Sequence, residues 1–231
     1  KMRGDGLEGA IYRGLKALLS DGGRETIRED TPSHWRRNNG YRLEALLDEA
    51  PNLAKLLCGS EGTLAVTTEL TCDLVEKPAT TGLGVVHFES RDDALRAVTT
   101  VLDTDPSAVE LFDGVAIERT LQTPGYAERL TFLEGTPGSV LITEYAGDTD
   151  AEVDAALAAL EQTMAEASRG YATVRVTEPD AIKNDWSIRT ERQGLRMVVE
   201  GRDKTVGFIE ASSVPVETPA SGSTTPPAPV P

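Results

Sequence analysis

Residues 57–78 read LCGSEGTLAVTTELTCDLVEKP, and the rest of the chain is best interpreted outward from this stretch. Residues 59–63 are small and polar, with two glycines three positions apart. Glycine accepts positive φ and lets other groups approach the backbone closely, so these residues predict a tight turn. Residues 64–75 are rich in β-branched side chains, which predicts a half-buried strand after the turn. A turn followed by a strand is also compatible with a plain hairpin that binds nothing.

Upstream segments add a pattern to this stretch. In order along the chain, R-x-x-G-Y-x-L covers residues 37–43, a Leu-Leu pair follows at 46–47, and G-S-E-G-T-L-x-V-x-T-E covers residues 59–69. Together they resemble the flavin-binding domain of FAD-linked oxidases. This is the vanillyl-alcohol-oxidase (VAO/PCMH) type of fold, in the branch of the D-lactate, glycolate and D-2-hydroxyglutarate dehydrogenases. The resemblance implies FAD as cofactor and a small 2-hydroxy acid as substrate.

Composition excludes some classes of function. The chain has 231 residues, enough for one or two domains, and a formal net charge of −15. Such an acidic chain argues against a nucleic-acid partner, because phosphates require a basic face. Cys58 and Cys72 are the only cysteines, in no zinc or iron–sulfur pattern, and are expected to be buried free thiols. The sequence shows no transmembrane segment and no signal peptide, so a cytoplasmic protein is expected, or one peripheral to the membrane through a partner.

The second half of the chain alternates between strand and helix periodicity. Ser90 can cap one helix, and Thr149-x-x-Glu152 forms a capping box for another. The order strand–helix–strand–strand–helix–strand predicts an α+β, ferredoxin-like antiparallel sheet with both long helices on one face. The predicted elements are residues 84–88, 91–102, 108–112, 139–145, 150–168 and 171–176.

These patterns predict a domain organisation. The resemblance implies that residues 1–78 are the C-terminal part of a FAD-binding domain, with a helix over 7–19 that ends at Gly22-Gly23. It implies that residues 79–217 are the cap domain over the flavin. Residues 218–231 are rich in Pro, Ser and Thr without an apolar face, so a disordered tail is expected.

The resemblance also implies two groups of site residues. Residues 180–192 and 208–215 are similar to the family's W-x-x-R helix and F-I-E-D-x-x-V-P strand, most closely in members fused to an iron–sulfur half, although Ala211 stands where the aspartate is usual. Arg189 is then the expected partner of the substrate carboxylate, which a guanidinium can bind with two hydrogen bonds. An ion pair with Glu191 or Asp185 is the alternative role. The expected FAD contacts are Gly59, Ser60, Glu61, Gly62, Thr63 and Val66.

Other motifs of the resembled family are missing from this chain. They are the glycine-rich pyrophosphate loops and H-x-G-D-G-N-x-H, which supplies metal ligands and the base. His34 is expected to be a solvated loop residue, and His87 a packed or edge residue of a strand rather than a ligand. The chain is therefore expected to be a fragment, inactive alone, with an unknown electron acceptor that an iron–sulfur domain or subunit would suit. The alternative is a non-catalytic ferredoxin-like module that binds a small molecule or a protein on an open sheet face.

Overall fold

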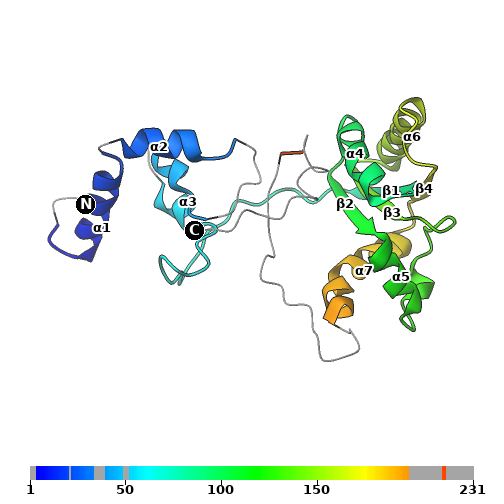
Figure 1. Ribbon diagram of the computed structural model, residues 1–231. Coiled ribbons are helices and arrows are strands. Elements are labelled where there is room, and N and C mark those ends of the chain that lie inside the picture. Colours follow the sequence, from blue (N-terminus) through cyan, green and yellow to red (C-terminus); the bar gives the residue numbers. More distant parts are fainter. Residues whose placement is uncertain (1–3, 21, 34–39, 49–51, 198–214, 217–231) are drawn as a thin grey trace. The chain divides into compact units, whose positions relative to one another are not determined.

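The computed structural model describes residues 4–20, 22–33, 40–48, 52–197 and 215–216 (Figure 1). The chain divides into two compact units, with the boundary between Asp73 and Leu74. Each unit is described by itself below. No helix in the described ranges combines the length and the apolar character needed to cross a membrane.

The first unit consists of short helices around a small core. The helix predicted over residues 7–19 is confirmed, but Gly22 and Gly23 do not end it. Gly22 instead precedes the next helix in a left-handed conformation, at φ 87°. Ile27, Leu46 and Leu56 are buried where three of these helices meet. The helices are α1 (Leu7–Leu18), α2 (Gly23–Asp30), η1 (Leu43–Leu46) and α3 (Leu53–Leu57).

The strand predicted over residues 64–75 is wrong for this structure. This segment has no regular secondary structure, and Val66 and Leu74 are 87% and 92% exposed. A β-branched sequence forms a strand only where a neighbouring strand supplies hydrogen bonds and apolar surface. None of the described strands pairs with this segment. Cys58 and Cys72 are free thiols, as expected, but both are exposed rather than buried.

The second unit is built on a four-stranded antiparallel sheet in the order β2-β3-β1-β4. This order and the intervening helices are those of the ferredoxin-like arrangement, so the predicted α+β cap architecture is confirmed. The strands are β1 (Thr80–Phe88), β2 (Ala108–Asp113), β3 (Ser139–Gly147) and β4 (Ala172–Val176). The helices are α4 (Arg91–Leu102), α5 (Gly114–Gln122), η2 (Ala127–Arg129), α6 (Asp150–Glu166) and α7 (Pro179–Met197).

The helices α4 and α6 cover one face of this sheet, as the sequence predicts (Figure 1). Both begin at the expected caps, where the side chains of Ser90 and Thr149 accept hydrogen bonds from backbone amides one turn into each helix. Gly84 of β1 allows α6 to approach, because a Cβ at this position would overlap Leu160. The core between the layers contains Val86, Phe88, Ala94, Ala97, Val101, Leu141, Tyr145, Val153, Leu157 and Leu160.

The opposite face of the sheet is covered as well. Here α5, α7 and the segment that contains Leu130 and Phe132 pack on the strands, on the other side from α4 and α6 (Figure 1). The buried residues include Leu83, Val85, Phe112, Val140, Ile142, Ile182 and Ile188. The binding-module alternative required an open sheet face. In the described part of the unit both faces are covered, so that alternative loses its binding surface.

Thr143 in β3 offers a first test of this core. Its hydroxyl oxygen is buried without a hydrogen-bond partner. Thr143→Val replaces the hydroxyl by a methyl group of similar shape and should raise the free energy of unfolding by about 1 kcal/mol, because an unpaired buried polar group is removed. Urea unfolding of the chain would measure this difference.

Thr120 in α5 is the matched control. It is equally buried, but its hydroxyl donates to the carbonyl oxygen of Ala116 at 2.8 Å. Thr120→Val removes a satisfied group and should lower the free energy of unfolding by about 1 kcal/mol. A loss of stability in both variants would show that the Thr143 hydroxyl is hydrogen-bonded after all.

Candidate functional site

The predicted turn at residues 59–63 is formed, and its backbone is left-handed at three of its five positions. The φ angles are 82° at Gly59, 51° at Glu61 and 76° at Gly62. Glu61 is a non-glycine residue in this region, which is uncommon. No atom lies within 4 Å of the position that a Cβ would take at Gly62, so this part of the turn is open to an approaching group.

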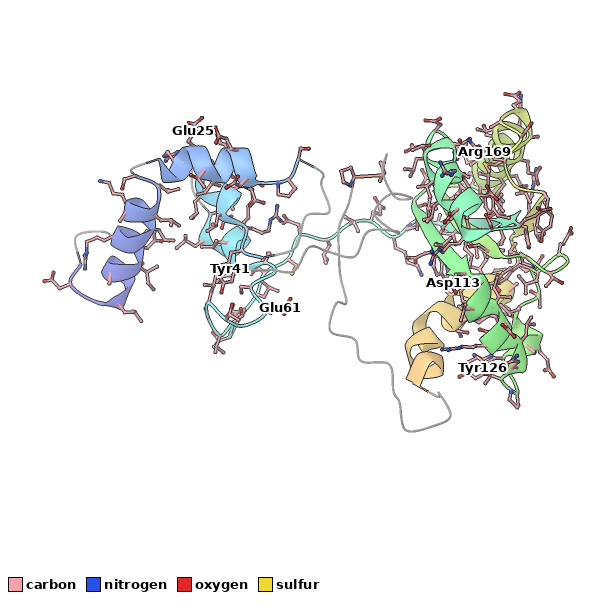
Figure 2. The ribbon with its side chains drawn as sticks, viewed as in Figure 1. Glu25, Tyr41, Glu61, Asp113, Tyr126 and Arg169 are labelled. Carbon is pink, nitrogen blue, oxygen red and sulfur yellow. The ribbon has the colours of Figure 1, made fainter. Side chains whose placement is uncertain are left out.

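Hydrogen bonds at both ends hold the turn in place. The amide of Ser60 donates to the carbonyl oxygen of Leu57 at 3.2 Å, and the amide of Thr63 donates to that of Ser60 at 2.9 Å. The Thr63 hydroxyl adds a bond to the same Ser60 oxygen at 2.6 Å and lies 2.9 Å from the Tyr41 hydroxyl. The turn is thereby joined to the segment of the G-Y-x-L pattern (Figure 2).

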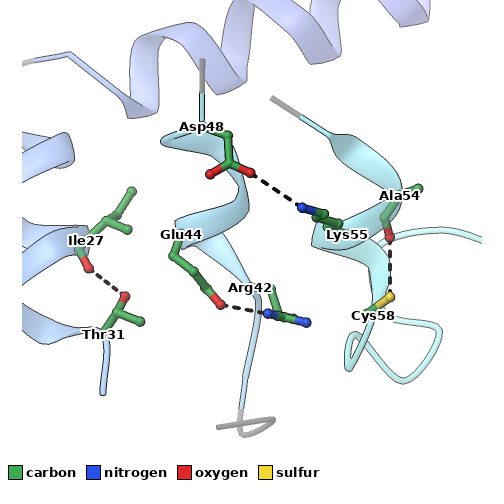
Figure 3. Close-up of polar contacts among 8 residues, drawn as sticks. All are labelled: Ile27, Thr31, Arg42, Glu44, Asp48, Ala54, Lys55 and Cys58. Carbon is green, nitrogen blue, oxygen red and sulfur yellow. Dashed lines mark hydrogen bonds and ion pairs between the residues drawn. The ribbon is translucent and has the colours of Figure 1, made fainter. Parts of the chain in front are cut away.

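The helices behind the turn contribute weaker polar contacts. Lys55 of α3 pairs with Asp48 at 3.6 Å, and the Cys58 thiol donates to the carbonyl oxygen of Ala54 at 3.5 Å (Figure 3). The side chains of Lys55 and Asp48 are more than half exposed. Exposed ion pairs of this kind stabilise little. The shape of the turn therefore depends mainly on its own backbone hydrogen bonds.

The turn fits a contact with part of FAD. None of the hydrogen bonds described for this unit uses the amides of Gly59, Glu61 or Gly62 as donors, and these three residues are exposed. Three free N–H groups on an open, glycine-containing turn can donate to the polar edge of a flat ligand. They are too few to compensate a pyrophosphate dianion, which needs a glycine-rich loop or a helix N-terminus. Val66 lies beyond the turn and is 87% exposed.

Arg189 lies in the middle third of α7, and its side chain is outside what the structure describes. Its role, including a pair with Asp185 or Glu191, remains a prediction. The preceding turns of α7 are firmly attached to the sheet. Ile188 is buried, and the Trp186 indole N–H donates to Glu144 of β3 at 2.8 Å. These contacts give the backbone at Arg189 a defined place on the second unit, whereas the glycine turn belongs to the first.

Asp185 is the residue that sequence reasoning missed. It is 2% exposed, and neither carboxylate oxygen has a hydrogen-bond partner. Desolvation raises the pKa of Asp185 to about 7. A signal was present, since Asp185 lies three residues after Ile182 and three before Ile188, within the apolar stripe of the helix.

His87 is a packed residue of β1, as predicted. It is fully buried, and desolvation lowers the pKa of its imidazole. Its Nε2 accepts a hydrogen bond from the Glu134 amide at 3.2 Å, so the proton lies on Nδ1, which donates to the Val85 carbonyl oxygen at 3.1 Å. The centroid of the Tyr171 ring lies 5.9 Å from that of the His87 imidazole. The neutral ring joins β1 to the loop before β3.

Two predictions concern residues that the structure does not describe. They are the loop role of His34 and the strand at 208–215, of which only Pro215 is described.

Comparison with known proteins agrees with this architecture. Residues 77–222, more than half of the chain, match the family described as FAD linked oxidases, C-terminal domain. A D-2-hydroxyglutarate dehydrogenase of Pantoea ananatis (strain AJ13355) is 26% identical over 222 residues, which cover 91% of this chain and 22% of that protein. The same-named enzyme of Escherichia coli (strain K12) is 27% identical over 206 residues, covering 84% and 20%. A D-lactate dehydrogenase of Anaerostipes hadrus is 27% identical over 142 residues, covering 60% and 30%. The chain spans about a fifth of the length of the two D-2-hydroxyglutarate dehydrogenases.

Proposed function

Because the chain belongs to the family of FAD linked oxidases, C-terminal domain, we propose that it is part of a longer flavoprotein that oxidises a D-2-hydroxy acid. The observation that carries this proposal is the family match over the whole ferredoxin-like unit, joined to relatives named D-2-hydroxyglutarate and D-lactate dehydrogenase. Family membership implies FAD as the cofactor, and FAD would supply the hydride acceptor.

Two groups of residues have roles in the proposed reaction. The amides of Gly59, Glu61 and Gly62 would donate to an edge of the cofactor, with Ser60, Thr63 and Val66 around them. Arg189 would bind the substrate carboxylate with two parallel hydrogen bonds and so orient the carbon that is oxidised. The attachment of α7 to the sheet through Trp186 supports this role, because a substrate-orienting side chain needs a fixed backbone.

The proposal extends to domain limits, electron acceptor and location. Residues 1–78 would complete a FAD-binding domain, residues 79–217 would form the cap and residues 218–231 a tail. An iron–sulfur domain or subunit would take the electrons. The similarity of the W-x-x-R helix to members with an iron–sulfur half supports this, as does the greater length of the relatives. A cytoplasmic location, with peripheral attachment to a membrane through a partner, would suit the acidic composition.

Arg189→Lys in the full-length protein tests the proposed substrate role. Lysine keeps the charge but loses the planar pair of donors, so one charge-assisted hydrogen bond is lost, at a cost on the order of 1.5–3 kcal/mol. We expect kcat/KM for the preferred hydroxy acid to fall by roughly tenfold to 150-fold. Steady-state kinetics with D-2-hydroxyglutarate, D-lactate and glycolate would measure it.

Arg96→Lys is the matched control for this substitution, since Arg96 is exposed on α4. It should leave kcat/KM unchanged, and both variants should melt at the wild-type temperature. If the Arg189 variant keeps the wild-type kcat/KM, Arg189 has no substrate role and is only a surface ion-pair residue. A lower melting temperature would instead indicate a structural role.

The isolated chain should bind FAD weakly and show no dehydrogenase activity. The three free amides of the glycine turn leave most of the FAD pyrophosphate charge uncompensated. Flavin absorbance of the purified chain and reduction of a dye with the three hydroxy acids would measure both properties. Stoichiometric flavin or dye reduction would contradict the expectation. Coexpression with a FAD-binding domain from the same protein should yield a yellow complex.

A further inference from the structure

Residues 129–134, called the strap below, lie on the sheet face that α7 also covers. Phe132 of the strap is buried in the same apolar core as Ile188 of α7. The guanidinium of Arg129 donates to the hydroxyl of Ser187, which is also on α7, at 3.3 Å. The strap therefore supplies both an apolar and a polar contact that hold α7 on the sheet.

Two hydrogen bonds fix the end of the strap at Glu134. Its amide donates to Nε2 of His87 in β1 at 3.2 Å, and its carbonyl oxygen accepts from the Tyr171 hydroxyl at 2.9 Å. The Tyr171 hydroxyl stays neutral far above pH 8, because burial raises its pKa. Only the bond to His87 therefore depends on a group that gains a charge between about pH 8 and pH 5.

The His87 imidazole holds the strap only while it is neutral. Its Nε2 accepts the Glu134 amide with a lone pair, and a proton on Nε2 would place a donor against a donor. Burial disfavours the charged ring and lowers the pKa of His87. The groups that oppose this shift are the carbonyl oxygens of Val85, Ala172 and Phe132 and the Glu134 carboxylate, the one charged group among them. Because burial outweighs these groups, a proton favours any state in which the ring reaches water.

We propose that the strap is an acid-sensitive latch, in which protonation of His87 releases Glu134 and opens the strap from the sheet. Between the ordinary pKa near 6.5 and the lowered pKa of the held ring, only the open state takes up the proton. Opening therefore becomes more favourable as the pH falls. Acid thereby removes the contacts of the strap with α7. The latch goes beyond the proposed function and depends on neither cofactor nor substrate.

Hydrogen exchange of the Glu134 amide in this chain measures the opening. The protection factor is the quantity to compare, because it removes the pH dependence of the intrinsic exchange rate. It should fall by up to about tenfold between about pH 7.5 and pH 5.5. The amide of Ser107, which donates to the carbonyl oxygen of Glu144 at 2.8 Å, is the control and should show no such fall. A parallel fall at Ser107 would mean that the whole unit opens, and would overturn the proposal.

Two variants assign the effect to the imidazole. His87→Gln keeps an acceptor near the position of Nε2 but cannot gain a proton, so the protection of the Glu134 amide should no longer depend on pH. Tyr171→Phe keeps the ring and removes the other hydrogen bond, so protection should fall a few-fold at both pH values with its pH dependence intact.

Protection of Glu134 that stays constant with pH in the wild type would overturn the proposal. So would a pH dependence that persists in His87→Gln or disappears in Tyr171→Phe. If His87→Gln does not fold, the wild type and Tyr171→Phe still decide the question, because the imidazole titrates in both.

Discussion

Asp185→Asn is expected to raise the free energy of unfolding of the isolated chain at about pH 8 by on the order of 4 kcal/mol. The pKa of Asp185 is raised from 3.8 to about 7 by burial. Between these values the folded state keeps a proton that the unfolded chain has lost, so stability falls as the pH rises. Above about pH 7 the full cost of the buried charge remains. Asparagine cannot ionise and avoids this cost.

The pH dependence identifies the cause of this effect. At about pH 4 the wild type holds a neutral carboxyl group at position 185, so the two proteins should have nearly equal stability. Urea unfolding at both pH values would measure the difference. Asp180→Asn is the control, since Asp180 is exposed in the first turn of α7 and should lose only about 0.5 kcal/mol at either pH. A gain for the Asp185 variant that is equal at both pH values would contradict the assignment to charge burial.

Gly138→Ala is expected to lower the free energy of unfolding of the second unit by about 3 kcal/mol or more. Gly138 precedes β3, and its amide donates to the carbonyl oxygen of Phe88 at 2.9 Å. A Cβ here would lie 2.7 Å from the carbonyl carbon of Glu89 and closer still to its oxygen. Because the obstacle is backbone, no side-chain rotation relieves it, and the paired ends of β1 and β3 must separate.

Thermal unfolding followed by circular dichroism would measure this effect as a fall in Tm of roughly 10 °C. Gly14→Ala is the control, since Gly14 lies within α1 and a Cβ there would meet nothing within 4 Å. This change should leave the second unit unaffected and favour the helix by up to about 1 kcal/mol. If the Gly138 variant melts at the wild-type temperature, the backbone at Glu89 has room for a Cβ at position 138, and the close contact does not limit stability.

Most of the second unit could be predicted from local patterns. Ser90 and Thr149 begin α4 and α6 where the sequence places caps, because the polar side chain of a cap bonds to amides only two or three residues away. The four strands follow from runs of apolar and β-branched residues bounded by turns. The glycine turn at 59–63 was predicted for the same local reason, since positive φ is a property of single residues.

The sequence by itself thus determined the turn, the helices with their caps, and the order of strands and helices in the second unit, all of which depend on neighbouring residues. The tertiary structure alone decided three other features. Residues 64–75 form no strand, because none of the described strands pairs with them. Gly138 is indispensable because another segment's carbonyl group lies against it. Asp185 is unpaired because the part of the sheet that packs over it offers no partner for its carboxylate, which the spacing to Ile182 and Ile188 does not specify even though it places Asp185 on the buried side of α7.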